Sequence, residues 1–430
     1  MENENDSKTT PNNAVTIQVL YVVNSGLASP TGGGRTRVIA SAKQSLKAGF
    51  SVRIVCFFRP QDALFHFSLL SAGRAALESE TGCEAHLIPR LSLTRISWIQ
   101  KLNAFYCGLV VALICRLYGV KVIHCHGLRP TIFALAARRM KKDLKVVADV
   151  HGATTEEYLY IRKLTRHDET ALELERQESL MLRESDWLIF VSGAMREFYE
   201  KKFGLRLRNY SIIPCAAESD FEIDYDRRES LREEFGLAHK HILCYVGDCE
   251  SYQLPDVMCR VFEDLRREFP SLFFLIFSHH RKKFIGHLEA AGVPSANYQV
   301  ISVEHTGIFE LLQMADIGLM LRDDSVVNRV ASPVKFGEYC LCGVPVISSD
   351  CIGDASKMIA DHKLGAIIPT TELSSPLLNA GIKNFVADVR EKRTEYAERC
   401  ATFARTHYRW EAYGPELSNI YFKVGAHSEK

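Results

Sequence analysis

Residues 328–347 read NRVASPVKFGEYCLCGVPVI, and this stretch decides the fold of the second half of the chain. Ser332 and Pro333 are typical of a helix start, where a small polar cap is followed by proline in the first turn. Lys335 and Glu338 stand three residues apart and so share one helix face. An ion pair on a solvated face would also explain this spacing, but the GVPVI that follows is typical of a buried strand. We therefore expect the helix to pack on a sheet.

The loop before this helix is expected to bind an anion. A helix N-terminus offers unpaired backbone N–H groups and the positive end of the helix dipole. Arg329 and Lys335 add two positive charges to that end. Glu338 can accept two hydroxyl hydrogen bonds, as from a ribose diol. The pattern therefore favours a binding loop over a surface ion pair.

Short apolar runs alternate with helix-like stretches along the rest of the chain, which indicates βαβ units around parallel sheets. In the first half, we expect strands at residues 15–23, 51–58, 120–125, 145–150 and 187–191. After an acidic linker at 218–226, the pattern restarts with strands at 241–246, 272–277, 299–302, 317–321, 344–348 and 365–368. The sequence therefore predicts two Rossmann-like, doubly wound α/β domains, residues 15–220 and 221–404, behind a disordered tail at 1–14. Ligands are expected in the cleft between them, at the carboxyl ends of the strands.

Length and composition support a protein of the cytoplasm. A chain of 430 residues is too long for a single core. Its most apolar segment, residues 104–115, is shorter than the roughly 20 residues of a membrane span and is expected to be a buried core helix. The N-terminus is polar, without the apolar core of a signal peptide. Most of the 13 cysteines lie in apolar runs, as in a reducing compartment, and Cys340 and Cys342 lack a second pair at zinc-site spacing.

Charge is distributed unevenly along the chain. Residues 1–150 contain 19 Lys and Arg against 9 Asp and Glu, a net charge of +10, while the remainder contains 34 against 43, a net charge of −9. A basic first half suggests an anionic partner, such as a phospholipid surface, a lipid-diphosphate acceptor or nucleic acid. No nucleic-acid-binding module accompanies the charge, so we expect no nucleic acid. A solvated basic surface without a partner stays an alternative.

A glycine-rich loop, TGGGR at residues 31–35, lies between the first expected strand and the helix after it. Gly33 and Gly34 let the backbone approach a ligand closely, and Arg35 adds a positive charge. The spacing is not the G-x-G-x-x-G of dinucleotide sites, and no Gly-Lys-Ser/Thr follows as in a phosphate-binding Walker loop. A contact with a phosphate is expected here, and a flexible turn is the alternative.

Histidines end two of the expected strands. His151, in Asp149-Val150-His151-Gly152, would open into the cleft, where it can hydrogen-bond a sugar hydroxyl or a developing charge. His124 and His126 point the same way on the strand before it, so a metal site is conceivable, but no carboxylate or cysteine partner is evident. A structural role is the alternative for each histidine, and we expect no metal.

Several segments together resemble family-4 glycosyltransferases. The segment SPVKFGEYCLCGVPVI at 332–347 resembles the family signature, and more narrowly a Ser-Pro-x-Lys branch of bacterial surface-polysaccharide enzymes. Further matching pieces are TGGGRTR, DVHG, ESDWLIFVSGAMREFYEKKFG, YVGDCESYQ and MADIGLMLRDD. The resemblance spans residues 15–425. It implies a GT-B fold, two facing Rossmann-like domains, with a terminal helix over 405–422, in a C-terminal crossover at 405–430, that returns to the first domain.

The resemblance also implies roles for individual residues. Glu338 would bind the donor ribose, and His151 would contact the transferred sugar. The loop with Arg329, Ser332, Pro333 and Val334 would hold the diphosphate and sugar. We expect His151, Lys335 and Glu338 to be the catalytic residues. Gly33 and Gly34 would lie against the diphosphate, and Arg35 and Gly247 are further expected donor-binding residues. The reaction would retain the anomeric configuration and use neither a metal nor a cofactor.

The chain departs from the family pattern in two places. Many members carry a second glutamate eight residues before the one at 338, but here position 330 is valine. Many also carry an arginine and a lysine after the glycine at 247, but here no cation comes before Arg260. Those cations neutralise the leaving diphosphate, which is the main electrostatic demand of the reaction. We expect Arg329 and Lys335 to supply that charge.

The sequence thus predicts transfer of a hexosyl or N-acetylhexosaminyl group from a nucleotide-diphosphate sugar, with UDP as the expected nucleotide. The acceptor is expected to be a glycan, linked to a lipid diphosphate, in polysaccharide biosynthesis. The protein would then work in the cytoplasm, at the inner face of the membrane. Two other classes stay open: a sugar-nucleotide epimerase, and a non-catalytic subunit that binds nucleotide sugars.

Overall fold

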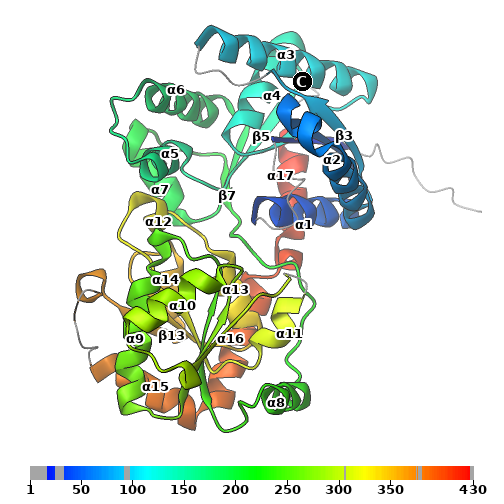
Figure 1. The fold of residues 1–430 in the computed structure, drawn as a ribbon. Helices are drawn as coiled ribbons and strands as arrows, with labels where there is room; N and C mark the ends of the chain where they lie inside the picture. The colour runs from blue at the N-terminus through cyan, green and yellow to red at the C-terminus, as the bar shows by residue number, and fades with distance from the viewer. Residues whose placement is uncertain are drawn as a thin grey trace, which may run out of the picture.

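The structure is a computed structural model that describes residues 17–24, 33–91, 97–304, 307–373, 375 and 380–426. The predicted tail at 1–14 and the first two residues of the TGGGR loop lie outside these residues. Two α/β domains lie one above the other in Figure 1, with the N-terminal domain at the top. Both predicted sheets are present.

Seven parallel strands form the described sheet of the N-terminal domain, in the order β3-β2-β1-β4-β5-β6-β7. Their bounds are β1 Gln18–Asn24, β2 Ser51–Phe58, β3 Glu84–Pro89, β4 Val122–His126, β5 Lys145–Val150, β6 Trp187–Phe190 and β7 Tyr210–Ile212. The helices between them are α1 Gly33–Lys47, α2 Pro60–Thr81, α3 Ser97–Leu117, α4 Leu128–Met140, α5 Thr154–Arg162, α6 Glu169–Glu184 and α7 Gly193–Phe203. β3 was not predicted, because it is a short edge strand with few buried residues.

Alternate residues of the central strands supply two cores, one on each face of the sheet. Tyr21 of β1 faces α1 and the C-terminal helix, whereas its neighbours Leu20 and Val22 face α3 and α4. Strands covered on both faces must be apolar at nearly every position. This requirement explains why the continuous apolar runs at 51–58 and 145–150 predicted β2 and β5 to the residue.

The C-terminal domain has a described sheet of six parallel strands in the order β10-β9-β8-β11-β12-β13. Their bounds are β8 His241–Val246, β9 Leu272–Phe277, β10 Tyr298–Ile301, β11 Ile317–Met320, β12 Val346–Ser349 and β13 Gly365–Ile368. The helices are α8 Tyr225–Glu234, α9 Pro255–Glu268, α10 Arg281–Ala290, α11 Ile308–Leu312, α12 Val326–Arg329, α13 Val334–Leu341, α14 Ala355–Asp361, α15 Ala380–Glu391 and α16 Arg393–His407. Single 3-10 turns are η1 Ser251–Gln253, η2 Ser295–Asn297 and η4 Thr370–Glu372.

Both sheets reverse their strand order at one point, between β1 and β4 in the first domain and between β8 and β11 in the second. At such a switch point the connections leave on opposite faces, which opens a crevice at the carboxyl ends of the two strands. Gly247 follows β8, and Arg322 follows β11 after one residue. The fold therefore places these two residues at the crevice of the second domain.

The C-terminal crossover is not one helix, as predicted over 405–422, but two. α16 ends at His407, and Arg409 then pairs with Ala217 as an extended strand residue. A 3-10 turn, η5 Trp410–Tyr413, leads into α17, Gly414–Ala426, which lies against the N-terminal sheet (Figure 1). Gly414 and the proline after it suit the start of a new helix and not the interior of a long one.

α17 is held in the N-terminal domain by a buried hydroxyl network. The hydroxyl of Tyr421 lies 2.9 Å from that of Tyr21 on β1 and 2.6 Å from Nδ1 of His124 on β4. Ser45 of α1 also bonds to Tyr21, at 2.9 Å. The last helix of the chain thereby completes the core of the first domain.

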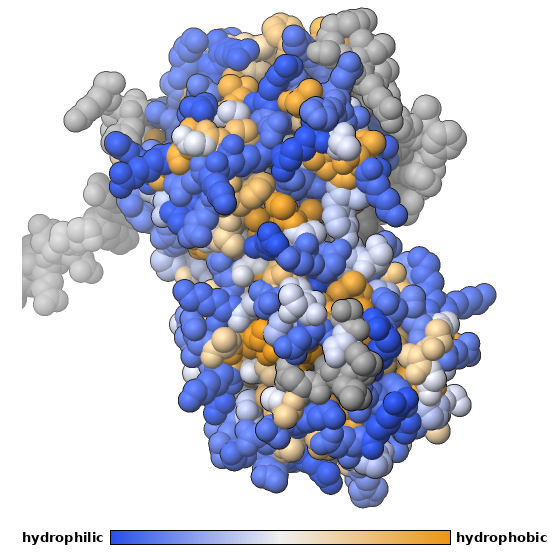
Figure 2. All heavy atoms as spheres, turned by 90° about the vertical axis from the view of Figure 1, so that its left-hand side faces the viewer, coloured by the Kyte–Doolittle hydropathy of each residue, from blue (hydrophilic) through white to orange (hydrophobic). Residues whose placement is uncertain are grey.

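Two loops join the domains directly. Asp354, before α14, accepts hydrogen bonds from the backbone N–H groups of Gly193 and Ala194 at the start of α7, at 2.6 and 3.0 Å. The Ser192 hydroxyl donates to the carbonyl of Val330 at 2.7 Å. Figure 2 shows the two lobes meeting at a narrow waist. A carboxylate at a helix N-terminus is a favourable contact, so this junction stabilises the closed arrangement.

The helix predicted at 104–115 to be a buried core helix is α3, and it is only half buried. Its inner face packs closely on α4, where a methyl group added to Gly108 would lie 2.6 Å from the Cβ of Ala136. Its outer face carries five side chains that are 39–75% exposed, which we call the α3 stripe: Leu102, Phe105, Leu109, Leu113 and Leu117. Within the described part of the chain, the 19 residues at 99–117 are also the one helical segment long and apolar enough to span a membrane by length and composition.

Candidate active site

The carboxyl end of β8 holds Gly247 directly against Lys335 of α13. Gly247 has φ = 137°, and a methyl group there would overlap the Lys335 Nζ atom. The ammonium donates to the Tyr245 hydroxyl at 3.2 Å and to the Gln253 side-chain carbonyl. It also lies 4.7 Å from the centre of the Tyr245 ring. Two predicted residues from segments far apart in the sequence thus meet at the switch point.

Lys335 makes no ion pair with any described carboxylate, although its charge is largely enclosed by protein. Burial, and to a lesser extent the Arg322 guanidinium, lower the pKa of its ammonium from 10.5 to about 7, although the charges of Glu338 and Asp248 oppose the shift. An amine with such a pKa gains strongly from an anion placed beside it. The site is therefore arranged to receive negative charge.

Arg322 is a site residue that the sequence did not predict. Its guanidinium donates to the Asn328 side-chain carbonyl at 3.1 Å and lies 5.4 Å from the centre of the Tyr252 ring. The adjacent Asp323 carboxylate is bonded instead to Asn328 and, across the domain junction, to Tyr160. Its location just beyond a buried strand was a usable signal, but its place beside β8 and Gly247 depends on the strand order.

The helix predicted from SPVKFGEY is α13, and its predicted donor-binding residues occupy its first turn and the loop before it. Pro333 is the N-cap, and Val334 begins the helix. Ser332 accepts a hydrogen bond from the backbone N–H of Cys215 in the other domain, at 3.1 Å, so this loop is anchored across the cleft. Glu338 is buried on the helix.

Arg329 and Lys335 bond to different residues. Its guanidinium forms two hydrogen bonds of 2.5 and 2.6 Å with Asp324, and its side chain is 60% exposed. A surface pair of this kind contributes at most about 1 kcal/mol to stability. In this structure the charge of Arg329 is already neutralised, so its donor role stays a prediction.

On the opposite side of the cleft, His151 follows β5 as predicted. A Cβ added to Gly127, after β4, would lie in ordinary contact with the His151 ring, 3.6 Å from Nε2, so it is the φ of 89° that favours glycine at this turn. Burial and the Arg37 charge lower the pKa of His151, whereas Asp149 opposes that effect. The ring is therefore neutral near pH 7 and can exchange one hydrogen bond as donor and one as acceptor.

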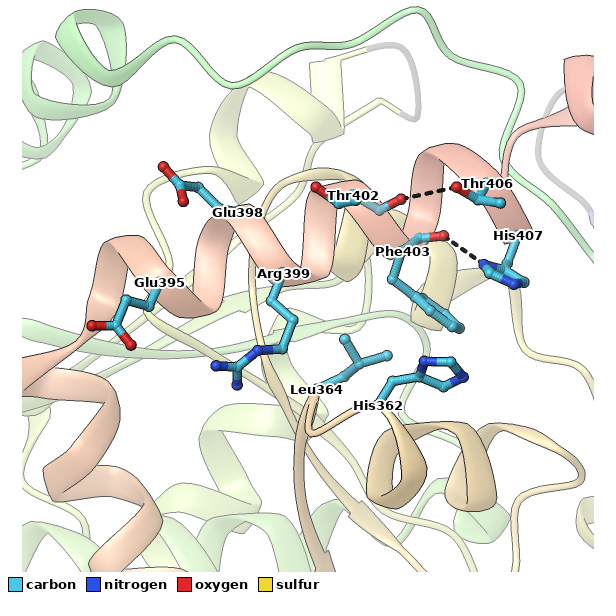
Figure 3. A pocket seen from close by; sticks show the side chains of 9 residues that line it. All are labelled: His362, Leu364, Glu395, Glu398, Arg399, Thr402, Phe403, Thr406 and His407. Atoms are coloured by element: carbon cyan, nitrogen blue, oxygen red, sulfur yellow. Dashed lines mark hydrogen bonds between the residues drawn. The ribbon is translucent and has the colours of Figure 1, made fainter.

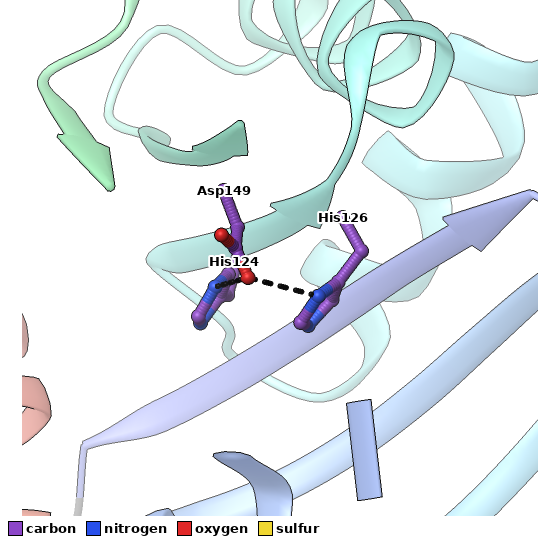
Figure 4. A group of neighbouring side chains, drawn as sticks. All are labelled: His124, His126 and Asp149. Atoms are coloured by element: carbon purple, nitrogen blue, oxygen red, sulfur yellow. Dashed lines mark ion pairs between the residues drawn. The ribbon is translucent and has the colours of Figure 1, made fainter. Parts of the chain in front are cut away.

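Near His151, Asp149 forms a buried cluster with His124 and His126 (Figure 4), and Arg37 also contacts it. The expectation that the two histidines lack a carboxylate partner is wrong, because β4 and β5 are neighbours and bring Asp149 to 3.2 Å from His126 Nδ1 and 3.8 Å from His124 Nε2. The three side chains would suit a metal by distance.

Arg37, however, already gives both Asp149 oxygens a charged donor, at 2.7 and 2.8 Å. Burial lowers the pKa of His126 to about 3, so its ring is uncharged. The arrangement is that of a buried Arg37–Asp149 ion pair flanked by the uncharged ring of His126 and by His124, and the centre of the His126 ring lies 6.3 Å from that of the His151 ring.

The glycine loop is described only from Gly33, which begins α1. Gly34 is exposed and has open space around its Cβ position, as expected of a backbone that a ligand can approach. The Arg35 guanidinium pairs with Glu80 of α2, at 3.1 and 2.7 Å. Its predicted contact with a donor would require that pair to open.

The arrangement of both domains is shared with solved glycosyltransferases. HepE from Anabaena, solved in complex with UDP, superposes with a TM-score of 0.70 at 13% identity over 95% of this chain and 100% of that one. Sucrose-phosphate synthase from Thermosynechococcus elongatus gives a TM-score of 0.67 at 16% identity, over 95% and 100%. WaaG, a glycosyltransferase involved in lipopolysaccharide biosynthesis, gives 0.61 at 15% identity, over 94% and 99%.

Sequence comparison assigns each half separately. Residues 31–221 match the family described as Glycosyltransferase Family 4, and residues 227–406 match Glycosyl transferases group 1. The chain is a GT-B glycosyltransferase by family and fold. The GT-B chain is also 23% identical to Spore coat protein SA of Bacillus subtilis (strain 168) over 204 residues. That match spans 46% of the chain and about half, 52%, of the relative.

A pocket of this GT-B protein lies on the C-terminal domain, along α16 and the loop before β13 (Figure 3). It is lined by His362, Phe403 and His407, whose rings pack together, and by polar residues of α16. None of the predicted site residues contributes to it. The cleft between the switch points therefore remains the site to which the predicted residues point.

Proposed function

We propose that this protein transfers a hexosyl or N-acetylhexosaminyl group from a nucleotide-diphosphate sugar, with UDP as nucleotide, to a glycan acceptor. The observation that supports the proposal most is the contact between Gly247 and Lys335 at the switch point of the second domain. The contact places Lys335 at the crevice of the sheet, and Lys335 forms no ion pair with any carboxylate among the residues that the structure describes. UDP is favoured because HepE was solved with UDP and with UDP-glucose.

In the proposed reaction, the bond between the sugar C1 and the diphosphate oxygen breaks, and its electron pair leaves with the diphosphate. The acceptor hydroxyl forms the new C1–O bond on the same face, which retains the configuration, and its proton passes to the leaving phosphate. Lys335 and the N–H groups at the start of α13 stabilise the diphosphate without a metal. The neutral His151 ring orients the sugar by a hydrogen bond.

We further propose that the acceptor is linked to a lipid diphosphate and reached at the inner face of the cytoplasmic membrane. α3, with no acidic residue between Ser97 and Leu117, presents the α3 stripe, and Lys101 and Arg116 are exposed near its two ends. A helix with an apolar outer face and basic flanks suits an anionic membrane surface. The net charge of +10 in residues 1–150 adds attraction of the same sign.

The test is transfer from labelled nucleotide sugars to lipid-diphosphate oligosaccharides by the purified full chain. We expect labelled glycolipid from at least one donor, with the anomeric configuration of the donor retained. Folded protein that transfers no sugar from any donor would refute the proposal. Donor converted without acceptor would indicate an epimerase, and donor bound without turnover would indicate a binding subunit.

A further inference from the structure

The donor crevice of the second domain contains two basic side chains, Arg322 and Lys335, that form no ion pair with any carboxylate in the described part of the chain, although Glu338, Asp248 and Asp323 lie close enough to act on their charges. Arg322 and Lys335 come from the carboxyl end of β11 and from α13, and η1 with Tyr252 and Gln253 lies against both. Burial lowers the pKa of Lys335, and the Arg322 charge acts in the same direction. Like charges at close quarters repel each other, so this pair costs folding free energy unless an anion joins it.

The acidic residues next to Arg322 are all engaged elsewhere. Asp323 is bonded to Asn328 and Tyr160, and Asp324 forms the pair with Arg329. The segment 322–329 thus contains two arginines and two aspartates, but only Arg329 of the two arginines is neutralised. If these charges served solubility alone, either arginine could be the one paired with an aspartate. In this segment Arg329, at the surface, is paired, and Arg322, in the crevice, forms no ion pair with any described carboxylate.

The tyrosine rings beside the two cations support the same conclusion. The Lys335 ammonium lies 4.7 Å from the centre of the Tyr245 ring, and the Arg322 guanidinium lies 5.4 Å from that of Tyr252. A cation over an aromatic face is stabilised without losing its charge. Neutral groups therefore hold both cations in place while their positive field stays available to a ligand.

We propose that Arg322 and Lys335 together form the binding site for the donor diphosphate, and that Arg322 is the second cation missing after Gly247. The inference rests on the proposed function, since it assigns the diphosphate of that donor to these two side chains. Arg322 follows β11, the strand next to β8 on the other side of the switch point, and supplies its charge from there. Arg329, the cation expected from the sequence, has no part in this site.

Calorimetry of nucleotide binding tests the proposal. A panel of UDP, GDP and ADP first identifies the nucleoside diphosphate that the wild type binds, and the matching nucleoside is measured beside it. Arg322→Gln is expected to weaken diphosphate binding about 10- to 100-fold, as for a charged hydrogen bond, and nucleoside binding less than about twofold. Arg322→Lys, which keeps the charge, is expected to recover part of the loss.

Two further variants make the test specific. Arg260→Gln removes a half-exposed arginine of the same domain, paired with Asp256 on α9, and is expected to bind as the wild type does. Thermal unfolding without ligand should show Arg322→Gln close to the wild type in stability, because the removed repulsion offsets the lost contacts with Asn328 and Tyr252. A merely structural arginine would instead lower that stability and weaken nucleoside and diphosphate binding alike.

The outcomes separate the two proposals. Wild-type protein that binds no nucleoside diphosphate would overturn the proposed function and this inference with it. If the wild type binds but Arg322→Gln binds equally well, or Arg329→Gln causes the loss instead, the function stands and the inference is overturned. An equal loss of nucleoside and diphosphate affinity in Arg322→Gln overturns it as well.

Discussion

Lys335 shows how a single side chain is set for its ligand by its surroundings. Its hydrogen-bond acceptors, the Tyr245 hydroxyl and the Gln253 carbonyl, are neutral, so they hold the ammonium without cancelling its charge. Its pKa of about 7 means that the free protein carries this charge only partly at neutral pH. A diphosphate would restore the proton, because an adjacent anion favours the charged form.

Binding of the nucleoside diphosphate at pH 8 is therefore expected to take up about one proton at Lys335. The same titration is done in two buffers of different ionisation enthalpy, and the uptake follows from the difference between the observed enthalpies. Lys335→Met should abolish the uptake, and an undiminished uptake in that variant would contradict the assignment.

The same pKa shift makes stability depend on pH in a defined direction. The folded pKa, about 7, lies below the unfolded value of about 10.4, so between these pH values the unfolded chain binds more protons. The free energy of unfolding of the wild type, relative to Lys335→Met, should accordingly rise from pH 7 to pH 9. Urea unfolding at several pH values measures it, and a fall over this range would refute the shift.

Asp149 is the second residue whose environment predicts a measurable effect. Asp149→Asn would leave the buried Arg37 guanidinium without its charge partner, which costs about 3–5 kcal/mol of unfolding free energy. Glu80→Gln removes the partner of the more exposed Arg35 and should cost no more than about 1 kcal/mol. Urea unfolding of both variants checks the contrast, and equal losses would contradict the buried pair.

At the scale of elements, the strands show what the sequence can predict. β2, β5, β8, β9 and β13 have the predicted bounds. In the inner strands among them, burial on both faces requires a nearly unbroken apolar run, whereas β13 is an edge strand with mostly half-buried residues. β3 escaped prediction because one edge of a sheet requires fewer apolar side chains. The break between α16 and α17 also escaped, since the pairing of Arg409 with Ala217 joins segments far apart in the sequence.

The site residues also fall into two groups: those that a local sequence pattern predicts, and those whose contacts depend on the fold. Gly247, Lys335 and His151 were found because each follows a recognisable strand or begins a recognisable helix. Arg322 was missed because only the strand order places β11, the strand that it follows, beside β8 and Gly247. The pairing of Arg329 with Asp324 depends on the short helix α12, which no apolar pattern announces.

α3 gives a prediction that belongs to an element. The double substitution Phe105→Ser with Leu113→Ser removes the centre of the α3 stripe, and each side chain is worth about 1.5–3 kcal/mol when buried in an apolar phase. We expect co-sedimentation with vesicles of phosphatidylglycerol and phosphatidylcholine to fall about tenfold or more. Leu172→Ser, on the exposed face of α6, should leave it unchanged.

Wild-type protein that does not sediment with these vesicles, or variants that sediment equally, would contradict a membrane role for α3. A wild type that is dimeric and a double variant that is monomeric, by light scattering, would instead assign the stripe to a second copy of the chain.

At the scale of the whole molecule, the two domains share more than a cleft. Asp354 joins them through α7, Ser332 joins them through Cys215, and α17 belongs by sequence to the end of the chain but by packing to its beginning. Closure of the cleft therefore depends on short polar contacts, whereas the crossover is held by a core. We expect motion of the domains to lengthen the polar contacts between them but to leave the packing of α17 on the first domain unchanged.

Tyr421→Ala tests the crossover. Loss of a buried aromatic side chain and its hydrogen bonds should cost about 3–5 kcal/mol in the N-terminal domain. Hydrogen–deuterium exchange should then increase in β1 and β4 but stay unchanged in β8 and β11. The neighbouring Phe422→Ala, at a residue that is 57% exposed, should change little, and equal exchange in both domains of Tyr421→Ala would contradict the shared core.

The position of Tyr421 also determines when the first domain can complete its fold during biosynthesis. It lies 400 residues after Tyr21, the β1 residue that it contacts. At about 5–20 residues per second, a ribosome needs roughly 20–80 s to make the chain between them. During that interval the second domain can assemble, while the first waits with an uncovered apolar face on its sheet. The part of the protein that is made first is thus the last to be finished, and chaperones would meet it in that state.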